Sequence, residues 1–133
     1  MRRHVALSFV LASLSLGVLA AQTSSALGDR TTPLRPLTGD TNVGVSNAVL
    51  RDQADVRAIR VMVTAGGKRA MHAHTDVKFH LFVPISGPMV VDLDGGQSVD
   101  VPAWQPYYMK AGTQHGFHNS GTAPVEIMEI FVK

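Results

Sequence analysis

The sequence predicts an all-β domain, either a sandwich or a barrel, in most of its 133 residues. Two observations carry this prediction. From residue 56 onward, short runs of β-branched and apolar residues alternate with turn residues at a spacing of roughly 8–12 residues, which is typical of a sandwich or barrel. The same region contains no long stretch with the periodicity of an amphipathic helix. The length of the chain also predicts one domain.

Six or seven short strands are predicted, and each ends at residues that favour turns. Gly66 and Gly67 end the first strand, and Asp94-Gly95 is a strong signal for a tight hairpin. Pro84 should put the second strand at a sheet edge or in an irregularity, because proline has no backbone N–H to donate. The predicted strands cover residues 56–63, 77–83, 89–93, 98–101, 106–109, 116–119 and 125–132.

The first twenty residues have the three-part layout of a secretory signal peptide. Arg2 and Arg3 precede an apolar run over residues 5–20, and small residues precede candidate cleavage sites after Ala20 and after Ala26. The alternative is an uncleaved membrane anchor, but the run is shorter than the roughly 20 residues that a spanning helix needs. We therefore expect a periplasmic or secreted protein without a stable membrane anchor.

The rest of the chain divides into two parts of different composition. Residues 27–47 are rich in turn-forming residues and are predicted to be a linker or an N-terminal arm, and residues 48–133 are predicted to form the barrel domain.

From residue 27 onward ten Lys and Arg balance ten Asp and Glu, so no basic face argues for a nucleic-acid partner. The chain has no cysteine, which excludes thiolate metal sites and disulfides.

The spacing of the histidines is the strongest functional signal. His72 and His74 are two residues apart, so on a strand both imidazoles project from the same face and can point into one cavity. His80 has the same parity, although an intervening turn weakens the argument. His115 begins another short strand, on which His118 faces the opposite way. The pattern predicts a cavity lined by several imidazoles.

Two sequence motifs resemble those of the cupin superfamily. The first motif of that family is a glycine, five residues, His-x-His, three or four residues, a glutamate, six residues and a glycine. The chain has Gly66, His72, His74, His80 and Gly87 at the corresponding places. The family's glutamate therefore falls on a histidine, after a gap that is one residue longer than usual.

The second motif of the family ends in Pro-x-Gly-x-x-His-x-x-x-Asn. Gly112, His115 and Asn119 match it, whereas Lys110 stands at the proline and Trp104 at the leading glycine. Two motifs in the right order make the resemblance specific. It covers residues 55–131 and implies a small, single-domain, jelly-roll-like β-barrel.

The resemblance also implies a metal centre. It implies His72, His74 and His115 as ligands of one divalent transition-metal ion, with His80 as a fourth ligand in place of the family's glutamate. A water molecule or Asp76 is the alternative to His80. Imidazole nitrogens suit transition metals better than Mg or Ca, and Fe, Mn, Ni, Cu and Zn are not distinguished by the sequence.

Function follows from the resemblance only as an expectation. A small-molecule oxygenase or related metalloenzyme is preferred, because some cupins with all-histidine iron sites are dioxygenases. The alternatives are a non-catalytic module that binds a small ligand or metal, and a metal-assisted isomerase or lyase. No catalytic residue is identified, since the facing of Glu126 and Glu129 in the last strand is unknown. The resemblance further implies a homodimer.

Four aromatic residues are candidates to line an apolar pocket for a small-molecule substrate. The alternative is that aromatic side chains fill the interior of a small barrel. These residues are Phe82, Trp104, Tyr108 and Phe117.

Overall fold

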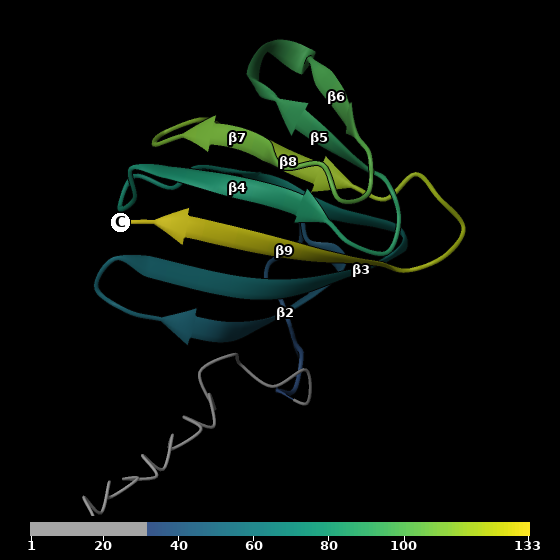
Figure 1. Cartoon of the computed structure of the whole chain (residues 1–133). Coiled ribbons are helices and arrows are strands. Elements are labelled where there is room, and N and C mark those ends of the chain that lie inside the picture. The colour runs from purple at the N-terminus through teal and green to yellow at the C-terminus, as the bar shows by residue number, and fades with distance from the viewer. Residues whose placement is uncertain (1–31) are drawn as a thin grey trace, which may run out of the picture.

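The structure is a computed structural model and describes residues 32–133 (Figure 1). The predicted signal peptide at residues 1–20, both cleavage sites and residues 27–31 of the arm lie outside this range. Within it, no helix is long and apolar enough to cross a membrane. The elements are β1 (Arg35–Pro36), β2 (Val43–Asp52), β3 (Val56–His72), β4 (Phe79–Pro84), β5 (Met89–Leu93), the short 3-10 turn η1 (Asp94–Gly96), β6 (Ser98–Val101), β7 (Tyr107–Lys110), β8 (His115–His118) and β9 (Val125–Val132).

The strands form one antiparallel sheet that curls into a nearly closed barrel (Figure 1). The order across the sheet is β6-β5-β8-β3-β9-β4-β7, and outside this path β2 pairs with both β3 and β1. The predicted all-β fold is confirmed. The hairpin at Asp94-Gly95 is confirmed as well, since β5 and β6 pair antiparallel across η1, where Gly95 has a φ of 75°.

The first predicted strand is longer than expected, because the two glycines bend it without ending it. β3 pairs with β9 as far as Val63 and with β8 from Lys68 onward. Gly66 between these parts has a φ of +69°, and a Cβ on Gly67 would lie 2.9 Å from the carbonyl oxygen of Thr64. Glycine tolerates both conditions. The bend carries β3 on to His72.

The strand β2 is not predicted by the sequence. It occupies residues 43–52 and pairs with β3 over most of its length, and Val45 lies opposite Val63 and is buried. β2 therefore begins five residues before the predicted domain boundary at residue 48. The arm is not a free linker over its described part either, because Arg35–Pro36 pairs with β2.

Pro84 is the last residue of β4, which is an internal strand, so of the two settings predicted for this proline, a sheet edge or an irregularity, the edge strand is wrong. β4 pairs with β7 only up to Phe82, whereas its pairing with β9 continues to Pro84. The proline therefore stands where one neighbour has already ended. The missing N–H is tolerated for this reason.

The barrel is filled with apolar side chains from almost every strand. Phe82 and Phe117 are fully buried, and their ring centroids are 5.1 Å apart. Asn119, which ends the second motif, is also buried: its Nδ2 donates toward the carbonyl oxygens of Val63 and Ala123, and its Oδ1 accepts from the Gly121 N–H. This side chain ties the loop after β8 to β3.

Candidate metal centre

Four histidines meet at one end of the barrel interior, although they come from three strands and a loop. His72 is the last residue of β3 and the register partner of His115 on β8, and their ring centroids are 4.4 Å apart. His80 on β4 lies 4.9 Å from the ring of His115, and 5.2 Å from that of His74, which follows β3. All four predicted metal ligands are therefore neighbours in the fold.

Two of the imidazoles have a defined tautomer. The Nδ1 atoms of His72 and His115 lie 2.9 and 2.8 Å from the carbonyl oxygens of Ala70 and Thr113. A carbonyl oxygen can only accept, so each Nδ1 carries the proton and each Nε2 keeps its lone pair. Backbone hydrogen bonds of this kind orient metal-binding imidazoles in many proteins.

Burial keeps the cluster neutral. It lowers the pKa of His72 and His74 from 6.5 to about 4 each, and that of His80 to about 3. Burial is also the main cause that lowers the pKa of His115. The charge that any one of these rings would carry further lowers the pKa of its neighbours. At neutral pH the rings are therefore in the unprotonated form that binds metals.

A buried carboxyl group completes the cluster, and the sequence reasoning missed it. Glu129 on β9 is buried, and its Oε1 lies 3.8 Å from the Nε2 of His80. Burial raises the pKa of Glu129 from 4.5 to about 7, although Arg69 and Arg57 act in the opposite direction. The signal was present in the alternation of β9, whose inward positions are Val125, Ile127, Glu129 and Phe131.

The donor atoms fall into two overlapping groups. One contains His72, His74 and His115, and the other contains His80, His115 and Glu129; within each group the ligand atoms lie within 4.8 Å of one another. The Nε2 atoms of His74, His80 and His115 and the Oε1 of Glu129 are buried and have no hydrogen-bond partner. Unpartnered buried polar atoms are costly, so this donor set fits a bound metal ion.

Two guanidinium groups stand beside the cluster. Arg57 lies over the ring of Phe131, 4.8 Å from its centroid, and that ring packs against His74 and His80. The charge of Arg69 lowers the pKa of His72, His74 and His115. With the histidines neutral, these two guanidinium groups place positive charge beside the site, although Arg57 also pairs with the carboxylate of Asp76. Positive charge near a site favours an anionic ligand.

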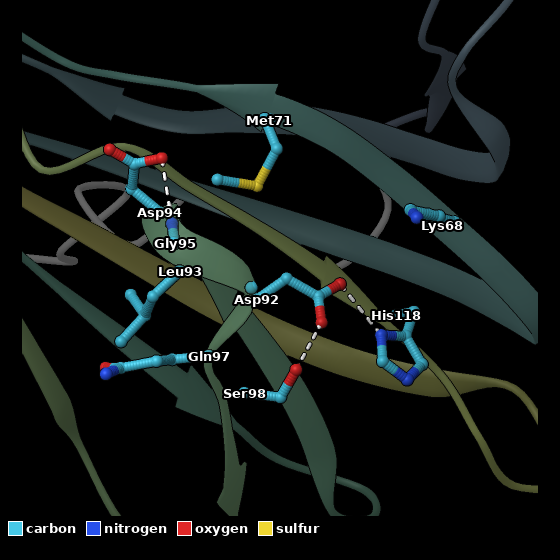
Figure 2. Close-up of a pocket in the computed structure, with 10 residues that line it drawn as sticks. Lys68, Met71, Asp92, Leu93, Asp94, Gly95, Gln97, Ser98 and His118 are labelled. Atoms are coloured by element: carbon cyan, nitrogen blue, oxygen red, sulfur yellow. Dashed lines mark hydrogen bonds and ion pairs between the residues drawn. The ribbon is translucent and has the colours of Figure 1, made fainter.

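His118 and Asp76 belong to neither group of donor atoms. His118 faces outward, as the alternation along β8 predicts, and its Nδ1 is 2.9 Å from the carboxylate of Asp92, which also accepts a hydrogen bond from Ser98 (Figure 2). The three residues line a separate surface pocket of about 400 Å³. Asp76 is exposed, and its carboxylate lies 3.4 Å from the Arg57 guanidinium.

The structure does not bring the four predicted pocket aromatics together. Phe82 and Phe117 are core residues within the barrel, whereas Trp104 is 71% exposed and Tyr108 is 53% exposed. The ring of Tyr108 packs instead against Phe79, at 5.2 Å between centroids. Side chains on a strand alternate between the two faces of the sheet, so Phe82 and Tyr108 can face opposite ways. Their aromatic character alone does not predict which face each one occupies.

Comparison with known proteins agrees with this architecture. No curated protein matches the chain. Among solved structures, the polyketide cyclase RemF from Streptomyces resistomycificus is 16% identical with a TM-score of 0.67, over 77% of this chain and 74% of that one. A cupin domain from Bordetella pertussis is 22% identical with a TM-score of 0.60, over 71% of this chain and 99% of that one.

A predicted oxalate decarboxylase from Thermotoga maritima is 20% identical with a TM-score of 0.59, over 66% of this chain and 79% of that one. At these identities the likeness shows the fold alone. The family model described as a cupin domain matches residues 59–131, which include all four histidines and Glu129. The chain therefore belongs to the cupin domain family.

Proposed function

We propose that this protein binds one divalent transition-metal ion and uses it to act on a small anionic molecule. The observation that carries the proposal is the set of buried, unpartnered Nε2 atoms on His74, His80 and His115, with His72 beside them. Such atoms are expensive to bury unless they bind something. Neutral imidazoles that cluster in one buried region are typical ligands of a transition metal.

The environment of the cluster supports an open, positively charged site. His80 and His115 are fully buried, whereas His72 and His74 are only half-buried, so a substrate would approach from the side of the latter two. A metal ion held there would supply a Lewis acid and open coordination positions. Arg57 and Arg69 would help to hold the negative charge of the bound molecule.

Two reaction classes fit this site. A small-molecule oxygenase is supported by the all-histidine motif ligands, which resemble those of certain dioxygenases. A metal-assisted isomerase or lyase is supported by the guanidinium groups, because a metal ion and nearby positive charge stabilise an oxyanion that forms during such reactions. The two classes differ in whether molecular oxygen is consumed.

The experiment has two stages, the first of which measures metal content. Protein purified from its native compartment is analysed for metals, together with His115→Ala and a matched control, His118→Ala. We expect about one ion per chain in the wild type and in the control, and loss of the ion in His115→Ala. Full occupancy in His115→Ala would contradict the proposed site.

The second stage measures catalysis. Oxygen uptake is followed with catechols, flavonols, diketones and thiols, and product formation is followed without oxygen for hydroxy and keto acids. Oxygen uptake that His115→Ala abolishes supports the oxygenase, and anaerobic conversion supports the isomerase or lyase. A metal-loaded protein that binds such molecules without converting them would instead be a non-catalytic binding module.

A further inference from the structure

Glu129 belongs to neither cupin motif, yet it is part of the same buried cluster. Its side chain is 9% exposed and faces His80, whose side chain is 2% exposed. The Oε1 of Glu129 and the Nε2 of His80 both lack a hydrogen-bond partner. A buried carboxyl group beside a buried imidazole, with neither bonded to the other, is an unusual and costly arrangement.

The distance between these two atoms explains the arrangement. At 3.8 Å it is too long for a hydrogen bond. Two ligands at about 2.1 Å from a metal ion in tetrahedral geometry would lie about 3.4 Å apart. The pair is therefore spaced to hold an ion between them after a small side-chain rotation, with His115 as the third ligand.

The two donor groups cannot both be occupied. They share His115, whose Nδ1 donates to the carbonyl oxygen of Thr113. Its Nε2 has a single lone pair and so can bind one ion at a time. His72 and His74 belong only to the first group, and His80 and Glu129 belong only to the second.

We propose that the barrel holds its metal ion in either of two mutually exclusive positions that share His115: an outer one with His72 and His74, and an inner one with His80 and Glu129. This inference rests on the proposed function, since it assumes that the cluster binds a metal. It deepens that function, because the two positions select different metals. The outer position has only imidazole ligands, and the inner one has two imidazoles and a carboxylate.

The chemistry of the ligands decides the selection. Carboxylate oxygen suits Mn, whereas imidazole suits Zn, Cu, Fe and Ni. Mn²⁺ should therefore depend on the inner position. Zn²⁺ binds nitrogen ligands well and should therefore occupy the outer position, which is also more accessible to solvent.

The test uses the two metals alone as probes. Mn²⁺ binding is measured from the loss of the free-ion signal in electron paramagnetic resonance, and Zn²⁺ binding from competition with a chromophoric chelator. The variants are Glu129→Gln, which keeps the shape of the side chain and removes its charge, and His72→Ala. Glu126→Gln is the matched control, since it makes the same substitution on the same strand at a position that faces away from the interior.

Opposite selectivity is expected in the two variants. Glu129→Gln should weaken Mn²⁺ binding at least about tenfold, since removing even an outer partner of a metal ligand costs about 10–100-fold, and should change Zn²⁺ binding much less. His72→Ala should do the reverse, and Glu126→Gln should match the wild type. In the wild type, Zn²⁺ should displace Mn²⁺ with a total of one ion per chain.

Each contrary result has a distinct meaning. Wild-type protein that binds neither ion overturns the proposed function itself. Wild-type protein that binds Zn²⁺ but no Mn²⁺, or that holds both ions together, overturns only the two exclusive positions. Variants that lose both metals in equal proportion also overturn them, because a single position would then be used by both ions. Circular dichroism of the metal-free variants separates lost binding from lost folding.

Discussion

On acidification, the lowered pKa of His80 should decrease the unfolding free energy of the metal-free barrel, whereas the raised pKa of Glu129 should increase it. The pKa of His80 is lowered from 6.5 to about 3 by burial, so the unfolded chain takes up a proton first, and stability is lost as the pH falls below 6.5. The pKa of Glu129 is raised from 4.5 to about 7 by burial. The folded chain therefore takes up that proton first, and stability is gained as the pH falls from 7 to 4.5.

The two contributions are similar in size. Each pKa unit is worth about 1.4 kcal/mol, and between pH 7 and pH 4.5 roughly two units of each shift are expressed, so each residue changes the unfolding free energy by about 2–3 kcal/mol. The signs are opposite, and in the wild type the two effects nearly cancel. The acid sensitivity that remains comes from the other three histidines, whose pKa values are lowered too.

The assay is urea unfolding of chelator-treated protein at pH 7 and pH 4.5. The difference between the two pH values is compared among variants, so that the packing cost of each substitution cancels. In His80→Gln the loss of stability on acidification should be smaller than in the wild type by about 2–3 kcal/mol, and in Glu129→Gln it should be larger by about the same amount. Glu126→Gln, on the outward face of β9, serves as the control. Equal differences in all four proteins would refute the electrostatic reasoning.

Three further outcomes are expected. Asn119→Ala should lower the free energy of unfolding by about 2–4 kcal/mol, because it leaves buried backbone groups without partners; a urea-unfolding change below about 1 kcal/mol would contradict the role given to this side chain. The protein should be a homodimer, which a barrel of this size gains from through added buried area, and a monomer mass in light scattering at micromolar concentration would disprove it. The exported protein should begin after Ala20 or Ala26, as N-terminal sequencing would show, and an intact Met1 in a cytosolic fraction would argue against export.

Local patterns in the sequence predicted much of the barrel. β5, β6 and β9 have the predicted bounds, and β4, β7 and β8 differ from theirs by one or two residues. The reason is that alternation and turn residues act over a few neighbours, within the reach of a sequence pattern. β2 was missed because its alternation is broken: the buried residues Val45 and Ala48 are three positions apart, and the register of β2 with β3 shifts twice.

The same distinction holds at the metal centre. The motif spacing predicted that His72, His74, His80 and His115 would meet, and the structure places them together. It did not predict Glu129 beside His80. Glu129 is the register partner of Phe82, two residues along β4 from His80, and this pairing joins residues 47 positions apart in the chain. The parity of residues along a strand predicts which side chains share a face of the sheet. Which strands are neighbours is known only from the pairing in the folded sheet.

Sequence alone was sufficient for the fold class and for the histidine cluster, since both depend on short-range periodicity and on motif spacing. The tertiary structure decided which charges surround that cluster. Arg57 reaches it across Phe131, and Glu129 lies on an inward position of β9 whose other members are apolar. The physical reason is that burial and electrostatic environment are properties of the packed barrel interior, where groups remote in the chain share a region that excludes water.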